Sequence, residues 1–126
     1  MDKHIRIAVL AHASMLIGFV FRYSFLFPLL IWKTLKHSQY SEFQAKQATY
    51  YQIFSFLLLL LISFAAQLLM LLPAPSDGKL VKVDELLVKQ IELVVYLLLS
   101  FYSLYGAYKC TRGEEFRYAF LDSKHL

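Results

Sequence analysis

Two long apolar segments constrain this chain more than any other feature of its sequence. Residues 52–72 contain no charged side chain, and neither do residues 93–108. A helix rises about 1.5 Å per residue, so residues 52–72 reach about 31 Å, enough to cross a hydrocarbon core of about 30 Å. We therefore expect an integral membrane protein whose main partner is the lipid bilayer.

The composition agrees with a membrane protein. Hydrophobic residues make up 59% of the chain and charged residues 17%, against about 45–50% and about 25% in soluble domains. The net charge is +4, but in a membrane protein Lys and Arg mark the cytoplasmic side. The basic balance therefore does not indicate a nucleic-acid partner. The single cysteine, Cys110, excludes an internal disulfide and leaves no second thiolate for a zinc site.

A third apolar stretch, Ile7 to Trp32, is interrupted by Arg22 and contains Pro28. As one helix it would place Arg22 near the middle of the bilayer, at a cost of at least about 2.5 kcal/mol. As a hairpin that turns near Arg22, it would have arms over residues 7–21 and 24–36, each about 20 Å long. The two topologies differ in the number of crossings and in where Arg22 lies.

The distribution of Lys and Arg favours the hairpin. If the chain turns at Arg22, nine of its 13 Lys and Arg residues lie on one side of the membrane. If residues 7–32 form a single span, the two sides are nearly balanced. Because cytoplasmic segments carry the excess of Lys and Arg, the hairpin topology predicts cytoplasmic termini, with Arg22 at the far interface.

Helix signals set the remaining boundaries. Ser41 and Gln44 fit a capping box that would start a helix near Glu42, and Asp84 is a plausible N-cap for the last span. We expect an all-α membrane bundle, a short hairpin plus two long transmembrane helices, with three to four spans. Its single domain, 1–126, divides into hairpin arms 7–21 and 24–36, an interfacial helix plus span 42–72, a last span 85–110 and a cytoplasmic tail 111–126.

A few polar side chains lie within the apolar segments. His12 could ligate a pigment or metal, but the sequence places no second ligand nearby, so we expect a structural hydrogen bond instead. Gln67, like Gln47 and Gln52, suits an interhelical hydrogen bond; lining a polar path is the alternative.

Arg22 has three possible roles. Its side chain can extend to the lipid headgroups, bind a lipid phosphate or pair with Glu92 at the same predicted interface. We favour the first role, because a long side chain at an interface needs only headgroups and water.

Small residues share one face of the last span and let another helix approach closely. They are Ser100, Ser103, Gly106 and Ala107. In the tail, Glu114 and Glu115 lie beside Arg112 and Arg117, which favours local ion pairs over acid–base catalysis. No phosphate-binding glycine loop, zinc motif or nucleophile motif is present. The sequence therefore predicts no enzyme activity and no cofactor.

Three short motifs resemble a known family. They are residues 10–14 followed by Gly18 and residues 28–33, then residues 45–52, and finally residues 113–118. In order and spacing they are similar to a family of small prokaryotic membrane proteins of unknown function, grouped with the chloroplast inner-envelope protein-import (Tic) component. The resemblance implies a multi-pass helical protein of the prokaryotic inner or plasma membrane, and for its distant branch a role in protein import.

Together these features predict a non-enzymatic accessory or scaffold subunit of a larger membrane complex. The alternative is a component of a transport or protein-translocation channel. The expected partners are other membrane subunits or further copies of the chain, and no nucleic acid.

Overall fold

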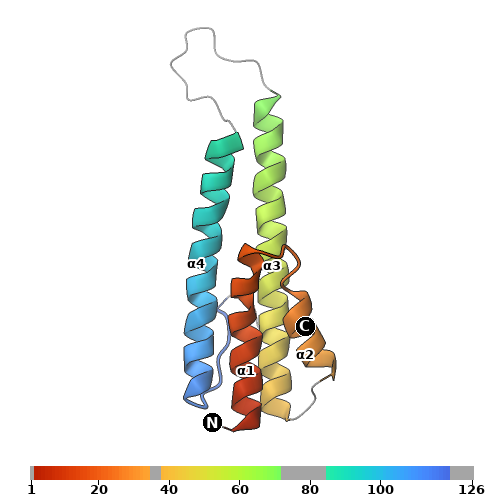
Figure 1. Ribbon diagram of the computed structural model, residues 1–126, viewed down its shortest axis with the longest axis vertical. Coiled ribbons are helices and arrows are strands. Elements are labelled where there is room, and N and C mark those ends of the chain that lie inside the picture. The colour runs from red at the N-terminus through yellow and green to blue at the C-terminus, as the bar shows by residue number, and fades with distance from the viewer. Residues whose placement is uncertain (1, 35–37, 72–84, 120–126) are drawn as a thin grey trace.

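The computed structural model describes residues 2–34, 38–71 and 85–119, and it confirms the all-α fold (Figure 1). Within these residues the secondary structure is helical, without strands. In chain order the elements are α1 (Lys3–Ala13), the 3-10 helix η1 (Ser14–Phe19), α2 (Leu26–Thr34), α3 (Gln39–Met70) and α4 (Glu85–Thr111).

The N-terminal segment forms the predicted hairpin. Helix α1 continues into η1, the chain turns between Val20 and Phe25, and α2 returns. Pro28 lies in the first turn of α2, where a missing backbone N–H leaves no helical hydrogen bond unmade. Helix α1 packs against both α3 and α4, whereas α2 packs against α3 on the side away from α4 (Figure 1). Arg22 therefore lies at the tip of a hairpin and not within a continuous span.

Helix α3 begins three residues earlier than the sequence predicts, and its capping box uses different residues. Ser38 is the N-cap: its Oγ accepts from the Ser41 backbone N–H at 3.1 Å, and Ser41 Oγ accepts from the Ser38 N–H at 3.2 Å. The prediction that Ser41 caps with Gln44 was therefore wrong. Gln44 is fully buried in the bundle and cannot reach back to the helix end. The predicted Asp84 cap and arm end at residue 36 lie outside the described residues.

Helices α3 and α4 are long and apolar enough to cross a membrane. Their most apolar windows have mean hydropathies of 2.5 and 1.5, and only 11% and 17% of these windows are buried inside the protein. The core helix of a soluble protein would be mostly buried, so these exposed apolar faces suit contact with lipid. The hairpin covers the N-terminal half of α3, and α3 and α4 extend beyond its tip (Figure 1).

A glycine ends α4 and turns the chain back into the bundle. Gly113 has φ +73°, a left-handed conformation that a residue without Cβ adopts without strain. The Gly113 N–H donates to Cys110 O and the Glu114 N–H to Lys109 O, at 2.9 and 3.2 Å, which is a Schellman motif. Residues 114–119 then run back along the bundle beside α4 and α1 (Figure 1), and here Phe116 and Tyr118 are buried.

Candidate functional site

A buried polar cluster joins three helices and the C-terminal segment around His12. The ring Nδ1 of His12 lies 2.7 Å from Tyr118 Oη, and Nε2 lies 2.8 Å from Gln44 Oε1. Ser103 Oγ donates to the backbone oxygen of His12 at 2.6 Å and lies 3.3 Å from Tyr118 Oη. We call these four residues, His12, Gln44, Ser103 and Tyr118, the His12 cluster.

The His12 cluster accounts for the histidine that the sequence singles out. Both ring nitrogens of His12 already have a partner, and the side chain is fully buried. In the described ranges no three His, Cys, Asp or Glu side chains gather as a metal site would require. His12 therefore holds the hairpin, α3 and the C-terminal segment together through its two ring nitrogens.

Further glutamines on α3 also bond to other parts of the chain. Gln47 Oε1 accepts from the Tyr118 backbone N–H at 3.2 Å, while Gln52 Nε2 donates to Ala11 O at 3.2 Å and to Ser14 Oγ at 3.0 Å. Gln67 differs, because it lies on an exposed part of α3 beyond the hairpin. The buried glutamines of α3 are Gln44, Gln47 and Gln52, and all three lie in the half of the helix that the hairpin covers.

The small residues of α4 are buried against the hairpin and the C-terminal segment. Ser100, Ser103, Gly106 and Ala107 are the buried residues of this face, with Cys110 one turn further. A Cβ added to Gly106 would lie 2.6 and 2.7 Å from two carbons of the Phe116 ring. Helix α1 packs against this face, and the Phe116 side chain packs there as well. The sequence analysis did not predict the position of Phe116.

Aromatic rings seal the C-terminal segment against the bundle. The rings of Tyr51 and Tyr118 stack with centroids 3.9 Å apart and planes 2° apart, and Phe116 packs edge-on against Tyr118 at 4.8 Å. Tyr40 Oη donates to Glu114 O at 2.7 Å. The sequence signal for this arrangement was weak: it consisted only of two aromatics placed just after a helix-ending glycine.

The charges of this segment form local ion pairs. Glu114 contacts Lys109 at 3.1 Å and Arg112 at 3.5 Å, and Glu115 contacts Arg117 at 2.8 Å. These carboxylates are thus paired with cations of α4 and of the segment that follows it.

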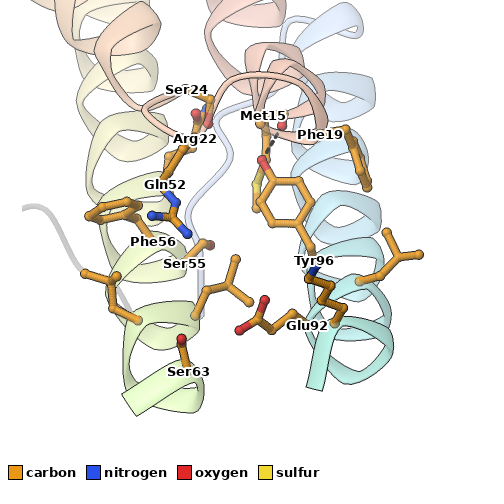
Figure 2. Close-up of a pocket in the computed structure, with 15 residues that line it drawn as sticks. Met15, Phe19, Arg22, Ser24, Gln52, Ser55, Phe56, Ser63, Glu92 and Tyr96 are labelled. Carbon is orange, nitrogen blue, oxygen red and sulfur yellow. Dashed lines mark hydrogen bonds between the residues drawn. The ribbon is translucent and has the colours of Figure 1, made fainter. Parts of the chain in front are cut away.

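A cavity of about 280 Å³ lies where the hairpin ends between α3 and α4 (Figure 2). The hairpin, α3 and α4 each contribute polar side chains to its lining. Its lining residues are Met15, Gly18, Phe19, Arg22, Ser24, Gln52, Ser55, Phe56, Leu59, Leu60, Ser63, Lys89, Glu92, Leu93 and Tyr96.

Arg22 and Glu92 reach this cavity from opposite sides. The Arg22 guanidinium extends from the hairpin tip along the α3 wall, and the Glu92 carboxylate extends from α4 (Figure 2). Neither they nor Lys89 form an ion pair with another residue of the described ranges. The structure thus brings Arg22 and Glu92 to one cavity, as the sequence allowed, but leaves a space between their charged groups.

Comparison with known proteins places the chain in a family. No curated protein and no solved structure matches it. A family model covers residues 3–122, nearly the whole chain, and nothing found links the chain to the chloroplast import component. The expected resemblance to a small membrane-protein family is therefore supported, whereas the import connection is not. The chain belongs to the magnetosome magnetite crystal formation protein family, MamF/MmsF.

Proposed function

We propose that this chain is a non-enzymatic protein of the magnetosome membrane that supports magnetite crystal formation as an accessory or scaffold subunit. The family description names the process, which is magnetite crystal formation. The His12 cluster supports a structural role over a catalytic one, because its side chains are hydrogen-bonded to one another.

The observation that carries this proposal is that both ring nitrogens of His12 have hydrogen-bond partners within the chain. The partners are the side chains of Tyr118 and Gln44, so the ring uses its hydrogen-bonding capacity within the bundle. The His12 cluster therefore serves to fix the position of the hairpin and the C-terminal segment. A rigid bundle with exposed apolar faces is well suited to pack beside other membrane subunits.

A genetic experiment with structure-based variants tests this proposal. In a magnetosome-forming host, deletion of the gene should change the size or number of magnetite crystals, and the wild-type chain should restore them. His12→Ala should not restore them, whereas a substitution that keeps the bundle intact, such as Tyr108→Phe on an exposed face of α4, should. Normal crystals after deletion would contradict a role in crystal formation.

A biochemical arm separates a scaffold from an enzyme. If the chain is an accessory subunit, purification in a mild detergent should yield a stoichiometric complex with another magnetosome membrane protein. His12→Ala should weaken that complex in proportion to its loss of folded protein. A variant that folds and assembles normally but abolishes crystal formation would instead indicate chemistry at His12.

A second candidate function is transport across the magnetosome membrane. It is favoured by the cavity between α3 and α4, because a polar hollow among lipid-facing helices is a typical feature of a solute path. Flux of an anionic or zwitterionic solute into proteoliposomes containing the purified chain, abolished by Ser63→Phe, would support transport. The absence of flux together with a stable subunit complex would favour the accessory role.

A further inference from the structure

The cavity at the hairpin tip is lined by polar groups, and the bundle leaves one of their atoms without a partner. Ser24 and Ser55 are buried in its wall, and Gln52 is 2% exposed. The Gln52 Oε1 is buried and lacks a hydrogen-bond partner among the described residues. A buried acceptor without a donor destabilises the protein, so this wall favours a ligand or water that supplies an N–H or O–H group.

The charges at the edge of the cavity select the sign of that ligand. Arg22 and Lys89 bring two positive charges and Glu92 brings one negative charge. Because the cations outnumber the carboxylate, the site suits an anion better than a metal cation. A phosphate between Arg22 and Lys89 would satisfy both cations, but it would leave Glu92 and the Gln52 Oε1 without a donor. The complementary ligand therefore carries a phosphate and also a cationic group with N–H donors.

The position of the cavity along the bundle indicates where such a ligand comes from. At the opposite end of the bundle the Lys33 ammonium lies 4.3 Å from the centre of the Trp32 ring, and Lys46 of α3 lies beside the same ring, a pairing typical of a membrane interface. On α4, no charged residue lies between Lys109 at that end and Glu92 in the cavity, and this stretch rises about 25 Å, close to the thickness of a hydrocarbon core. The cavity therefore lies near the headgroups of the other leaflet.

The walls and the volume fit one part of a lipid. Phe19, Leu60 and Leu93 line the cavity and are also exposed on the outside of the bundle, so acyl chains can follow the apolar surface outward. A volume of about 280 Å³ lies just below the range of about 300–1,000 Å³ typical of sites for whole drug-sized molecules. It is adequate for a headgroup but not for a complete lipid.

We propose that this cavity binds the headgroup of a zwitterionic aminophospholipid, of the phosphatidylethanolamine type. Arg22 and Lys89 contact the phosphate, while Glu92 accepts from the ammonium group and Gln52 Oε1 from a donor of the same headgroup. The acyl chains lie against Phe19, Leu60 and Leu93. The bound lipid would add to the contacts that already join the hairpin to α3 and α4, namely Tyr23 with Phe56 and Tyr96 Oη with Met15 O.

A binding experiment on the delipidated full-length protein in mild detergent tests the proposal. The probes are dihexanoyl phosphatidylethanolamine, dihexanoyl phosphatidylglycerol and inorganic phosphate, and the readout is the midpoint of thermal unfolding as each is added. Phosphatidylethanolamine should raise the midpoint at the lowest concentration. Equal responses to inorganic phosphate would overturn the lipid assignment, and equal responses to phosphatidylglycerol would overturn the role of Glu92.

Variants assign the effect to the cavity. Arg22→Gln should weaken the response to both lipids by about tenfold, equivalent to the loss of one charge-assisted hydrogen bond. Glu92→Gln should remove the preference for phosphatidylethanolamine. Lys3→Gln, at the opposite end of the hairpin, is the matched control and should respond as wild type does. Ser63→Phe, which fills the cavity without removing a charge, should abolish the response; an unchanged response in a folded Ser63→Phe protein would overturn the site.

Discussion

The Tyr118 hydroxyl lies 2.7 Å from His12 Nδ1, although 106 residues separate the two side chains in sequence. This contact joins the first helix to the segment that follows the last one. Because Tyr118 also stacks on Tyr51 of α3 and its backbone N–H donates to Gln47, one residue links the hairpin, a transmembrane helix and the C-terminal segment. The His12 cluster thus joins the C-terminal segment to the hairpin and to α3.

Tyr118→Phe tests how much the His12 cluster stabilises the bundle. The substitution keeps the ring and its stacking on Tyr51 but leaves His12 Nδ1 without its partner. Loss of one partner of a buried hydrogen bond costs about 1–3 kcal/mol, so the free energy of unfolding should fall by that amount. Unfolding by SDS titration in mixed micelles measures it.

Tyr108→Phe is the control for this prediction. Tyr108 is on the same helix as Ser103 but is 55% exposed, so removal of its hydroxyl should change the free energy of unfolding by less than about 0.5 kcal/mol. Equal effects of the two substitutions would mean that the His12–Tyr118 hydrogen bond adds nothing to stability.

The sequence predicted the membrane fold because that fold depends on local signals. Apolar length identifies α3 and α4, and Arg22 with the distribution of Lys and Arg identifies the hairpin. Local signals could not pair His12 with Gln44, because the partner is selected by the packing of α1 against α3 and not by spacing along the chain. For the same reason Gln44 was assigned to a helix cap that Ser38 and Ser41 form instead.

The C-terminal segment was the least predictable part of the site. Its charges indicate a solvated tail, and the ion pairs of Glu114 and Glu115 are indeed at the surface. The burial of Phe116 depends on Gly106, which lies ten positions earlier and leaves room for the ring only because it lacks a Cβ. The small residues of α4 indicated close packing, but their pattern does not specify whether a helix or a returning chain occupies the space.

Gly106→Ala should displace the C-terminal segment. The new Cβ would lie 2.6 Å from the Phe116 ring, and overpacking of this kind costs about 1–3 kcal/mol. We expect a lower free energy of unfolding and faster amide hydrogen exchange over residues 114–119, measured by mass spectrometry.

A double-mutant cycle identifies the cause of that displacement. In a Phe116→Ala background the ring is absent, so adding Gly106→Ala should cost little further stability. If Gly106→Ala costs the same in both backgrounds, the clash with Phe116 is not the reason for its effect.

Gly18→Ala should disturb the hairpin near its tip. A Cβ at this position would overlap Tyr96 Oη and lie 2.5 Å from Tyr96 Cζ, and Tyr96 Oη donates to Met15 O. The tyrosine must therefore move and lose this hydrogen bond, and the free energy of unfolding should fall by about 1–3 kcal/mol.

Two comparisons isolate the contact with Tyr96. In a Tyr96→Leu background the shorter side chain leaves space for the new methyl group, so Gly18→Ala should be nearly neutral there. Val20→Ala, which trims a side chain that is 91% exposed, controls for a general effect of substitution in the turn. A large cost of Gly18→Ala that persists in the Tyr96→Leu background would refute the clash.

Cysteine accessibility tests the topology that follows from the hairpin. Cys110 is the single cysteine of the sequence, so Cys110→Ser gives a background without thiols. Lys3→Cys and Arg112→Cys lie at one end of the bundle, whereas Arg22→Cys and Glu85→Cys lie at the hairpin tip and at the start of α4. With cytoplasmic termini, the first pair should react with a membrane-impermeant maleimide only after the cells are opened, because the reagent must reach the cytoplasmic face.

Arg22→Cys is the decisive position in this set. If the hairpin tip reaches the far interface, its thiol should react in intact spheroplasts of a host that carries the chain in its inner membrane, together with that of Glu85→Cys. The arms are too short to span a full hydrocarbon core alone, so this result depends on the packing of the hairpin against Phe56 of α3 and Tyr96 of α4. Labelling of Arg22→Cys only from the cytoplasm, or not at all while Glu85→Cys reacts, would mean that the tip stops within the bilayer. The cavity would then lie too deep to bind a headgroup.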